Sequence, residues 1–255
     1  MRNIKMLLMY DGNSYSGWQR LGLSEKNNSI QGILEETISS YLGEEIHIIG
    51  SGRTDAGVHA LGQVANFKSN TKIKLSALME DINRKLPEDI RILKIEYVDN
   101  DFHSRYSAVS KTYEYRIDTG ERQSVFSRKY TYHVPETLNI ENMKKAAEYL
   151  IGTHDFKAFS TDRKDLKSTV RTIYDIDIYK PLIKYNYHNQ NELRIQVTGN
   201  GFLYNMVRII TGTLISVGEG KMSANDIELI LKNKKREMAG ITLNPQGLFL
   251  IKVRY

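Results

Sequence analysis

Asp55 is the residue whose type and surroundings best suit covalent or acid–base chemistry. It lies in the stretch 50–60, Gly-Ser-Gly-Arg-Thr-Asp-Ala-Gly-Val-His-Ala, between two apolar runs. The glycines and other small residues there would let another chain approach the acid closely. Arg53 can keep a carboxylate ionised through a charge-assisted hydrogen bond. The competing interpretation is a plain turn, because an aspartate among glycines often bonds only its own backbone.

Other catalytic chemistries find little support in the sequence. The chain contains no cysteine, which excludes disulfides, thiolate metal ligands and a cysteine nucleophile. The six histidines do not cluster at the spacing of metal ligands. The adjacent His154 and Asp155 are better explained as a hydrogen-bonded loop. We therefore expect no metal.

The composition is that of a globular protein outside the membrane. Hydrophobic residues make up 40% of the 255 positions and charged residues 26%. The first residues lead into an apolar run that is too short for a signal peptide. The longest apolar stretch, 206–217, contains Arg208 and several polar residues and falls short of a membrane span. These features predict a cytoplasmic protein.

The charge balance favours an anionic partner. The formal net charge is +6 and the sequence pI is about 9.2, and each phosphate contacted by Lys or Arg adds affinity through counterion release. The sixteen tyrosines also suit stacking on unpaired bases, although tyrosine is common in ordinary sheets. Nucleic acid is thus a candidate partner on composition alone.

Hydrophobic periodicity predicts two similar halves. In the first half, strands are expected over 5–10, 45–49, 62–67 and 91–98, with helices over 30–42 and 75–86. Ser29 and Gly43 have the types expected of the caps of the first helix. This β-α-β-β-α-β order is that of a ferredoxin-like unit with an antiparallel sheet.

The second half repeats the alternation of strands and helices. Strands are expected over 108–117, 129–134, 170–179, 193–198 and 248–253, and helices over 140–150, 202–217 and 223–232, with a hairpin arm at 184–191. We predict an α/β fold of the α+β type, in which two ferredoxin-like or RRM-like halves with mostly antiparallel sheets join around a central catalytic cleft. The expected domains are 1–106, which carries the Asp55 loop, and 107–255.

Several stretches together resemble the TruA-type tRNA pseudouridine synthases. The unbroken run 52–60 is similar to the catalytic motif of that family, and a match of this length is far more specific than a glycine-rich loop. Further resemblances occur in the family's order along nearly the whole chain, at 10–12, 17–19, 102–108, 111–113, 152–156, 170–173, 206–209 and 247–248.

The resemblance implies an isomerase that needs no cofactor. Its chemistry breaks the N-glycosidic bond of uridine, turns the base and joins C5 to C1′. By resemblance, Asp55 is the nucleophile, Arg208 is the cation that keeps it ionised, and Tyr113 lies against the uracil. Arg53 would contact the RNA and Leu248 would form a wall of the pocket. Whether Asp55 attacks the sugar, attacks the base or removes a proton stays open.

The implied substrate is uridine at positions 38, 39 and 40 of the tRNA anticodon stem-loop, bound across a homodimer. The segment 241–246 departs from the family's pattern, and the arm 184–191 lies where relatives vary. Two alternatives therefore stay open. The same chemistry could act on ribosomal RNA or on a subset of tRNAs, or the chain could be an RNA-binding protein without catalysis.

Overall fold

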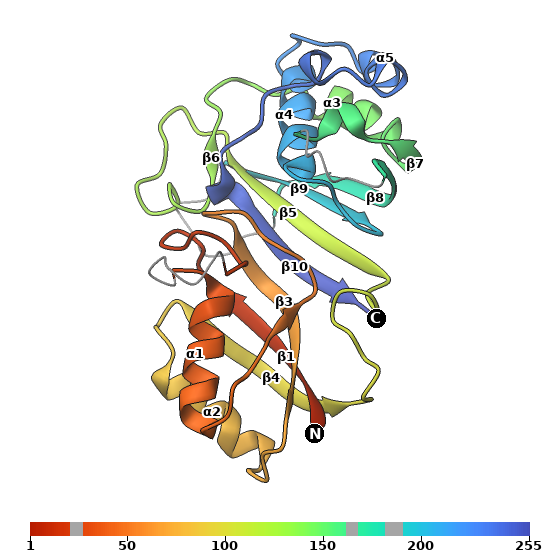
Figure 1. Cartoon of the computed structure of the whole chain (residues 1–255). Coiled ribbons are helices and arrows are strands. Elements are labelled where there is room, and N and C mark those ends of the chain that lie inside the picture. The colour runs from red at the N-terminus through yellow and green to blue at the C-terminus, as the bar shows by residue number, and fades with distance from the viewer. Residues whose placement is uncertain (21–27, 162–167, 182–190) are drawn as a thin grey trace. The chain divides into compact units, whose positions relative to one another are not determined.

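A computed structural model describes residues 1–20, 28–161, 168–181 and 191–255 of the chain (Figure 1). These residues form two compact units: unit 1 contains Met1–Val109 together with Phe249–Tyr255, and unit 2 contains Ser110–Leu248. The last residues of the chain thus pack with the first half. The two domains expected from the sequence, 1–106 and 107–255, were defined as the two sides of a catalytic cleft. That division stays a prediction.

The sheet of unit 1 has an antiparallel core with the strand order β4-β1-β3. Two strands pair with β3 along the side that faces away from β1. Strand β2 pairs with Ala65 and Asn66, and β10 pairs in parallel with His59 and Ala60. The order along the chain matches the expected β-α-β-β-α-β unit, with β10 added. The strands are β1 (Arg2–Tyr10), β2 (Ile49–Gly50), β3 (His59–Ser69), β4 (Ile90–Val98) and β10 (Leu248–Arg254).

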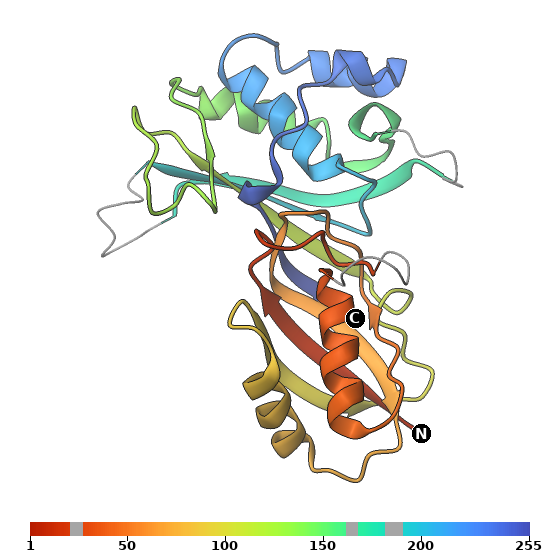
Figure 2. The same cartoon turned by 60° about the vertical axis from the view of Figure 1, so that its left-hand side comes forward.

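Two neighbouring helices, α1 (Ile30–Leu42) and α2 (Leu75–Lys85), complete unit 1 (Figure 2). The side chain of Ser29 accepts a hydrogen bond from the backbone of the first turn of α1, which confirms it as the N-cap. Gly43 ends the helix in the left-handed conformation with φ 66°, where glycine has no Cβ to strain. The caps read from the sequence therefore set both ends of α1.

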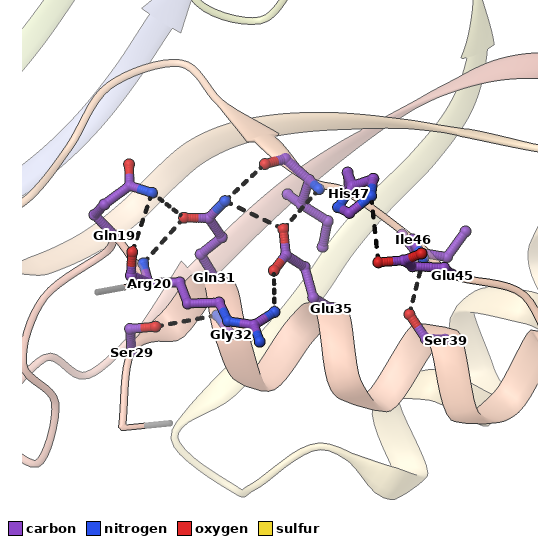
Figure 3. Close-up of polar contacts among 11 residues, drawn as sticks. Gln19, Arg20, Ser29, Gln31, Gly32, Glu35, Ser39, Glu45, Ile46 and His47 are labelled. Atoms are coloured by element: carbon purple, nitrogen blue, oxygen red, sulfur yellow. Dashed lines mark hydrogen bonds and ion pairs between the residues drawn. The ribbon is translucent and has the colours of Figure 1, made fainter. Parts of the chain in front are cut away.

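The strand expected over 45–49 is wrong for most of its length, because only β2 forms there. Side chains of α1 bind the backbone that a neighbouring strand would need (Figure 3). The Ile48 N–H donates to Glu35 Oε1 at 2.9 Å, and the Ile48 carbonyl accepts from Gln31 Nε2 at 3.0 Å. A backbone group already bonded in this way does not join a sheet ladder.

The sheet of unit 2 has the order β5-β9-β8-β7, with antiparallel neighbours. Of the strand expected over 129–134 only β6 forms, and it pairs with the end of β5 in parallel. The side chain of Asp118 accepts from the N–H groups of Gly120 and Ser124, which shapes a wide loop instead of a tight turn. The strands are β5 (Ser110–Asp118), β6 (Tyr132–His133), β7 (Gly152–Asp155), β8 (Val170–Tyr179) and β9 (Glu192–Gly199).

The strand β7 was not expected, since His154 and Asp155 were interpreted as a loop. It pairs along its length with the start of β8. The hairpin arm expected at 184–191 lies outside the described residues except for Asn191. The pairing of β8 with β9 on either side of it is antiparallel as expected.

Three helices pack in unit 2: α3 (Ile140–Glu148), α4 (Met206–Gly218) and α5 (Asp226–Asn233). Nearly every residue of α4 is buried, as its uniformly apolar sequence predicts. It begins later than expected, because Asn205 has a left-handed backbone with φ 61° and cannot continue a right-handed helix. Single turns of 3₁₀ helix are η1 (Lys157–Phe159), η2 (Arg236–Met238) and η3 (Pro245–Gly247).

The structure confirms the α+β class, with mostly antiparallel strands and five α-helices in the part of the chain that it describes. None of the helices in that part is both long and apolar enough to cross a membrane. The burial of alternate β1 residues, such as Ile4, Met6 and Leu8, shows where the core of unit 1 lies.

Candidate active site

Asp55 lies at the start of a turn in the loop that leads into β3. The Val58 N–H donates to the Asp55 carbonyl at 3.1 Å, and Gly57 in this turn has φ +76°. The Asp55 side chain is half-buried, while Arg53 two residues earlier is exposed. The turn interpretation is thus correct for the backbone, and the residue as a whole keeps part of its surface exposed.

Three close approaches at glycines hold this loop and the segment that follows β1 in place. A Cβ on Gly12 would overlap the Val58 carbonyl, and one on Gly17 would lie 2.6 Å from the Thr54 carbonyl. A Cβ on Gly50 would enter the ring of Trp18. Glycine is therefore required at all three positions for steric reasons.

The segment after β1 is itself held by α1. Gln31 Oε1 accepts from Gln19 Nε2 at 2.8 Å and from the Arg20 N–H at 3.1 Å (Figure 3). The Trp18 N–H in turn donates to the Thr54 carbonyl at 3.0 Å. Helix α1 thus positions the Asp55 loop through one intervening segment.

A buried hydrogen-bond network lies beneath the loop. Tyr10 Oη is 2.8 Å from Thr54 Oγ1, and Gln63 Nε2 donates to the Gly52 carbonyl at 3.1 Å. Gln63 Oε1 accepts from Ser51 Oγ at 2.7 Å. Burial raises the pKa of Tyr10 to about 12, so its hydroxyl stays neutral at physiological pH. The network fixes the backbone on both sides of Arg53.

His59 holds the other end of the loop. Its buried Nδ1 accepts from the Gly12 N–H at 3.0 Å and lies 3.2 Å from Asp11 Oδ1. The ring stacks on Phe249 of β10 with centroids 4.6 Å apart. No role was predicted for Tyr10, Gln63 or His59 from the sequence, although Tyr10 and His59 belong to stretches that resemble the family.

Tyr113 and Tyr115 have different surroundings, although both lie on the same face of β5. Tyr115 is fully buried, and its hydroxyl donates to the Asn244 carbonyl at 2.6 Å. Tyr113 keeps 8% of its surface exposed and contacts Phe202 edge to face, with centroids 5.2 Å apart. Tyr115 therefore packs fully in the core, while Tyr113 keeps a small part of its surface exposed.

Arg208 projects from the first turn of α4 and is half-buried. Its Nε donates to the Leu243 carbonyl at 2.6 Å, and its Nη1 donates to Asn205 Oδ1 at 2.7 Å. Burial raises the pKa of Tyr115, and the charge of Arg208 opposes that rise. Arg208 thus lies near Tyr115 with a defined guanidinium plane.

Leu248 is buried at the first position of β10, directly after η3. A Cβ on the preceding Gly247 would overlap the Tyr115 ring, so the backbone passes directly over that ring.

Arg53 and Asp55 belong to unit 1, and Tyr113, Arg208 and Leu248 to unit 2. Their catalytic and binding roles stay predictions. Among the described residues, no group of three or more His, Asp and Glu side chains could hold a metal ion.

Comparison with known proteins identifies the class of this chain. A family model described as tRNA pseudouridine synthase matches residues 6–107 and 146–255. The chain therefore belongs to the tRNA pseudouridine synthase family, whose members are isomerases that act on RNA.

Individual relatives match over the full length. The chain is 48% identical to a protein of Thermoanaerobacter sp. (strain X514) and 46% identical to one of Clostridium botulinum (strain Alaska E43 / Type E3), both named tRNA pseudouridine synthase A. It is 44% identical to tRNA pseudouridine synthase A 2 of Bacillus cereus. Each comparison covers 100% of both chains.

Proposed function

We propose that this protein converts uridine to pseudouridine at positions 38, 39 and 40 of the tRNA anticodon stem-loop. The observation that carries the proposal is the Asp55 loop, which resembles the family's catalytic motif in sequence and is held by glycine contacts and a buried polar network. The names of the full-length relatives support tRNA as the substrate.

In the proposed reaction, the ionised carboxylate of Asp55 acts as the nucleophile and assists departure of N1 from C1′. The base turns while it is held, C5 bonds to C1′ as the carboxylate is released, the hydrogen on C5 leaves as a proton, and N1 takes up a proton. A partly buried carboxylate tends to be protonated, so a nearby cation must oppose that tendency. We assign this role to Arg208.

The remaining site residues act on the RNA. A stacked uridine cannot reach the carboxylate, so the base must leave the helix, which costs a few kcal/mol. The exposed Arg53 would contact the backbone and favour this state. Tyr113 would lie against the uracil, where its hydroxyl can serve the final proton transfer, and Leu248 would form an apolar wall.

We further propose that the enzyme works in the cytoplasm as a homodimer, with tRNA as its partner and without metal or cofactor. The basic balance of the chain, with a formal net charge of +6, supports a polyanionic partner. The reaction itself transfers no electrons and leaves the atoms of the nucleotide unchanged in number, so it needs no co-reactant.

Release of tritium from tRNA labelled at C5 of uridine tests the proposal, because forming the C5–C1′ bond expels that hydrogen. We expect release with the wild type, none with Asp55→Asn, and normal release with the control Asp101→Asn, which changes an exposed acid elsewhere in unit 1. Substrates with cytidine at positions 38–40 should release nothing.

Other results would redirect the assignment. Release from ribosomal RNA alone would show the same chemistry on another substrate. Binding of tRNA without release from any RNA would show an RNA-binding protein without catalysis.

A further inference from the structure

Asn205 has an unusual backbone next to the proposed catalytic arginine. Among the residues that the structure describes, Asn205 (φ 61°) and Lys234 (φ 58°) are the non-glycine residues with positive φ. Asparagine tolerates this conformation better than most residues, but glycine adopts it with less strain. A residue kept in a strained conformation suggests that its side chain has a task.

The side chain of Asn205 is oriented by two hydrogen bonds. Its Oδ1 accepts from Arg208 Nη1 at 2.7 Å, and its Nδ2 donates to Thr161 Oγ1 at 3.0 Å. A guanidinium has only donors, so the amide oxygen must face Arg208 and the amide nitrogen must face Thr161. The amide is therefore fixed in one orientation.

The second anchor of Arg208 is the Leu243 carbonyl, which accepts from Nε at 2.6 Å. The segment that carries this carbonyl is itself tied down, since the Gly240 N–H donates to Thr213 Oγ1 at 2.9 Å and the Asn244 carbonyl accepts from Tyr115 Oη at 2.6 Å. Two acceptors on different guanidinium atoms define the plane of the group.

We propose that Asn205 is a positioning residue that sets the guanidinium plane of Arg208 for catalysis. The left-handed backbone turns the Asn205 side chain back toward the first turn of α4, where it meets Arg208 three residues later. This inference rests on the proposed catalytic role of Arg208 in pseudouridine formation. It explains why the position before α4 holds asparagine where glycine would be less strained.

Asn205→Gly separates positioning from folding. Glycine accepts the left-handed conformation without strain, which offsets part of the stability lost with the two side-chain hydrogen bonds of Asn205, so the melting temperature should fall by no more than a few degrees. Loss of a hydrogen bond to a charged group should lower kcat for tritium release about tenfold, with KM changed by less than about twofold because RNA contacts elsewhere remain. Lys234→Gly makes the same backbone change at the C-cap of α5 and should leave kcat unchanged.

Asn205→Asp tests whether the acceptor is what matters, because aspartate keeps an oxygen at the same place and also tolerates positive φ. Its kcat should recover toward that of the wild type. A normal kcat in Asn205→Gly, or equally low values in both variants, would overturn the positioning role while wild-type activity still supports the proposed function. No tritium release from the wild type would overturn both.

Discussion

Tyr10 Oη lies 2.8 Å from Thr54 Oγ1, although 44 positions separate these residues in the sequence. Both side chains are buried, and Thr54 directly precedes Asp55. The contact joins the end of β1 to the loop that carries the proposed nucleophile. Because a buried hydroxyl without a partner costs free energy, this pair favours one position of the loop over others.

Thr54→Val should reduce both stability and turnover. Valine has the shape of threonine but leaves the Tyr10 hydroxyl without this partner, which should cost about 1–3 kcal/mol of unfolding free energy. Thr54→Ser keeps the hydroxyl and should retain most of the activity. Urea unfolding and tritium release measure the two effects. Equal behaviour of the two variants would show that the hydroxyl contributes nothing.

Gly17→Ala should displace the Asp55 loop. Gly17 has φ +107°, and an added Cβ would meet the Thr54 carbonyl at 2.6 Å. Gly43→Ala is the matched control, since Gly43 also has positive φ but nothing lies within 4 Å of its Cβ position. Both should lose about 1 kcal/mol from backbone strain, but only Gly17→Ala should also lose most of its kcat. Matching kcat values would contradict the bracing role of this contact.

Arg208→Ala should abolish turnover and lower the melting temperature. The change removes the donors that the Leu243 carbonyl and Asn205 Oδ1 now have, and it removes the proposed partner of Asp55. Arg208→Lys keeps the charge but cannot reach both acceptors at once, so we expect partial stability and little activity. Full activity with an unchanged melting temperature would rule out both roles.

Alkaline pH should destabilise the protein partly through Tyr10. Burial raises its folded-state pKa to about 12, compared with about 10 in an unfolded chain. Between these values the unfolded state loses the proton first, so the free energy of unfolding falls as pH rises through this window. In Tyr10→Phe, the free energy of unfolding should fall by about 2–3 kcal/mol less between pH 9 and 12 than it does in the wild type. Part of the loss should remain, because burial also raises the pKa of Tyr115 and Tyr255.

Arg53→Ala should weaken tRNA binding in a salt-dependent way. Arg53 is exposed beside Asp55, and removing one phosphate contact should reduce the slope of log affinity against log salt by about 1. Arg84 is also exposed, but it pairs with Asp81 on α2, so Arg84→Ala should leave the slope unchanged. Filter binding at several salt concentrations measures these slopes. Identical slopes for the two variants would show that Arg53 does not contact the RNA.

The features that could be predicted from the sequence are those whose signals are local. The ends of α1 follow from Ser29 and Gly43, and the all-round apolar pattern of α4 predicts its burial. The run 52–60 indicates the family, because nine adjacent residue types form a signal that does not depend on distant contacts. Such features depend on neighbours in the chain, which a sequence displays directly.

Which distant groups meet became visible only in the folded chain. There β10 returns to β3, β6 runs parallel to β5, and residues 45–48 bind side chains of α1 instead of forming a strand. The partners of Tyr10 and Asn205 were likewise not predicted. These outcomes depend on which backbone and side-chain groups compete for each hydrogen bond after the chain has folded, and a local pattern carries no record of that competition.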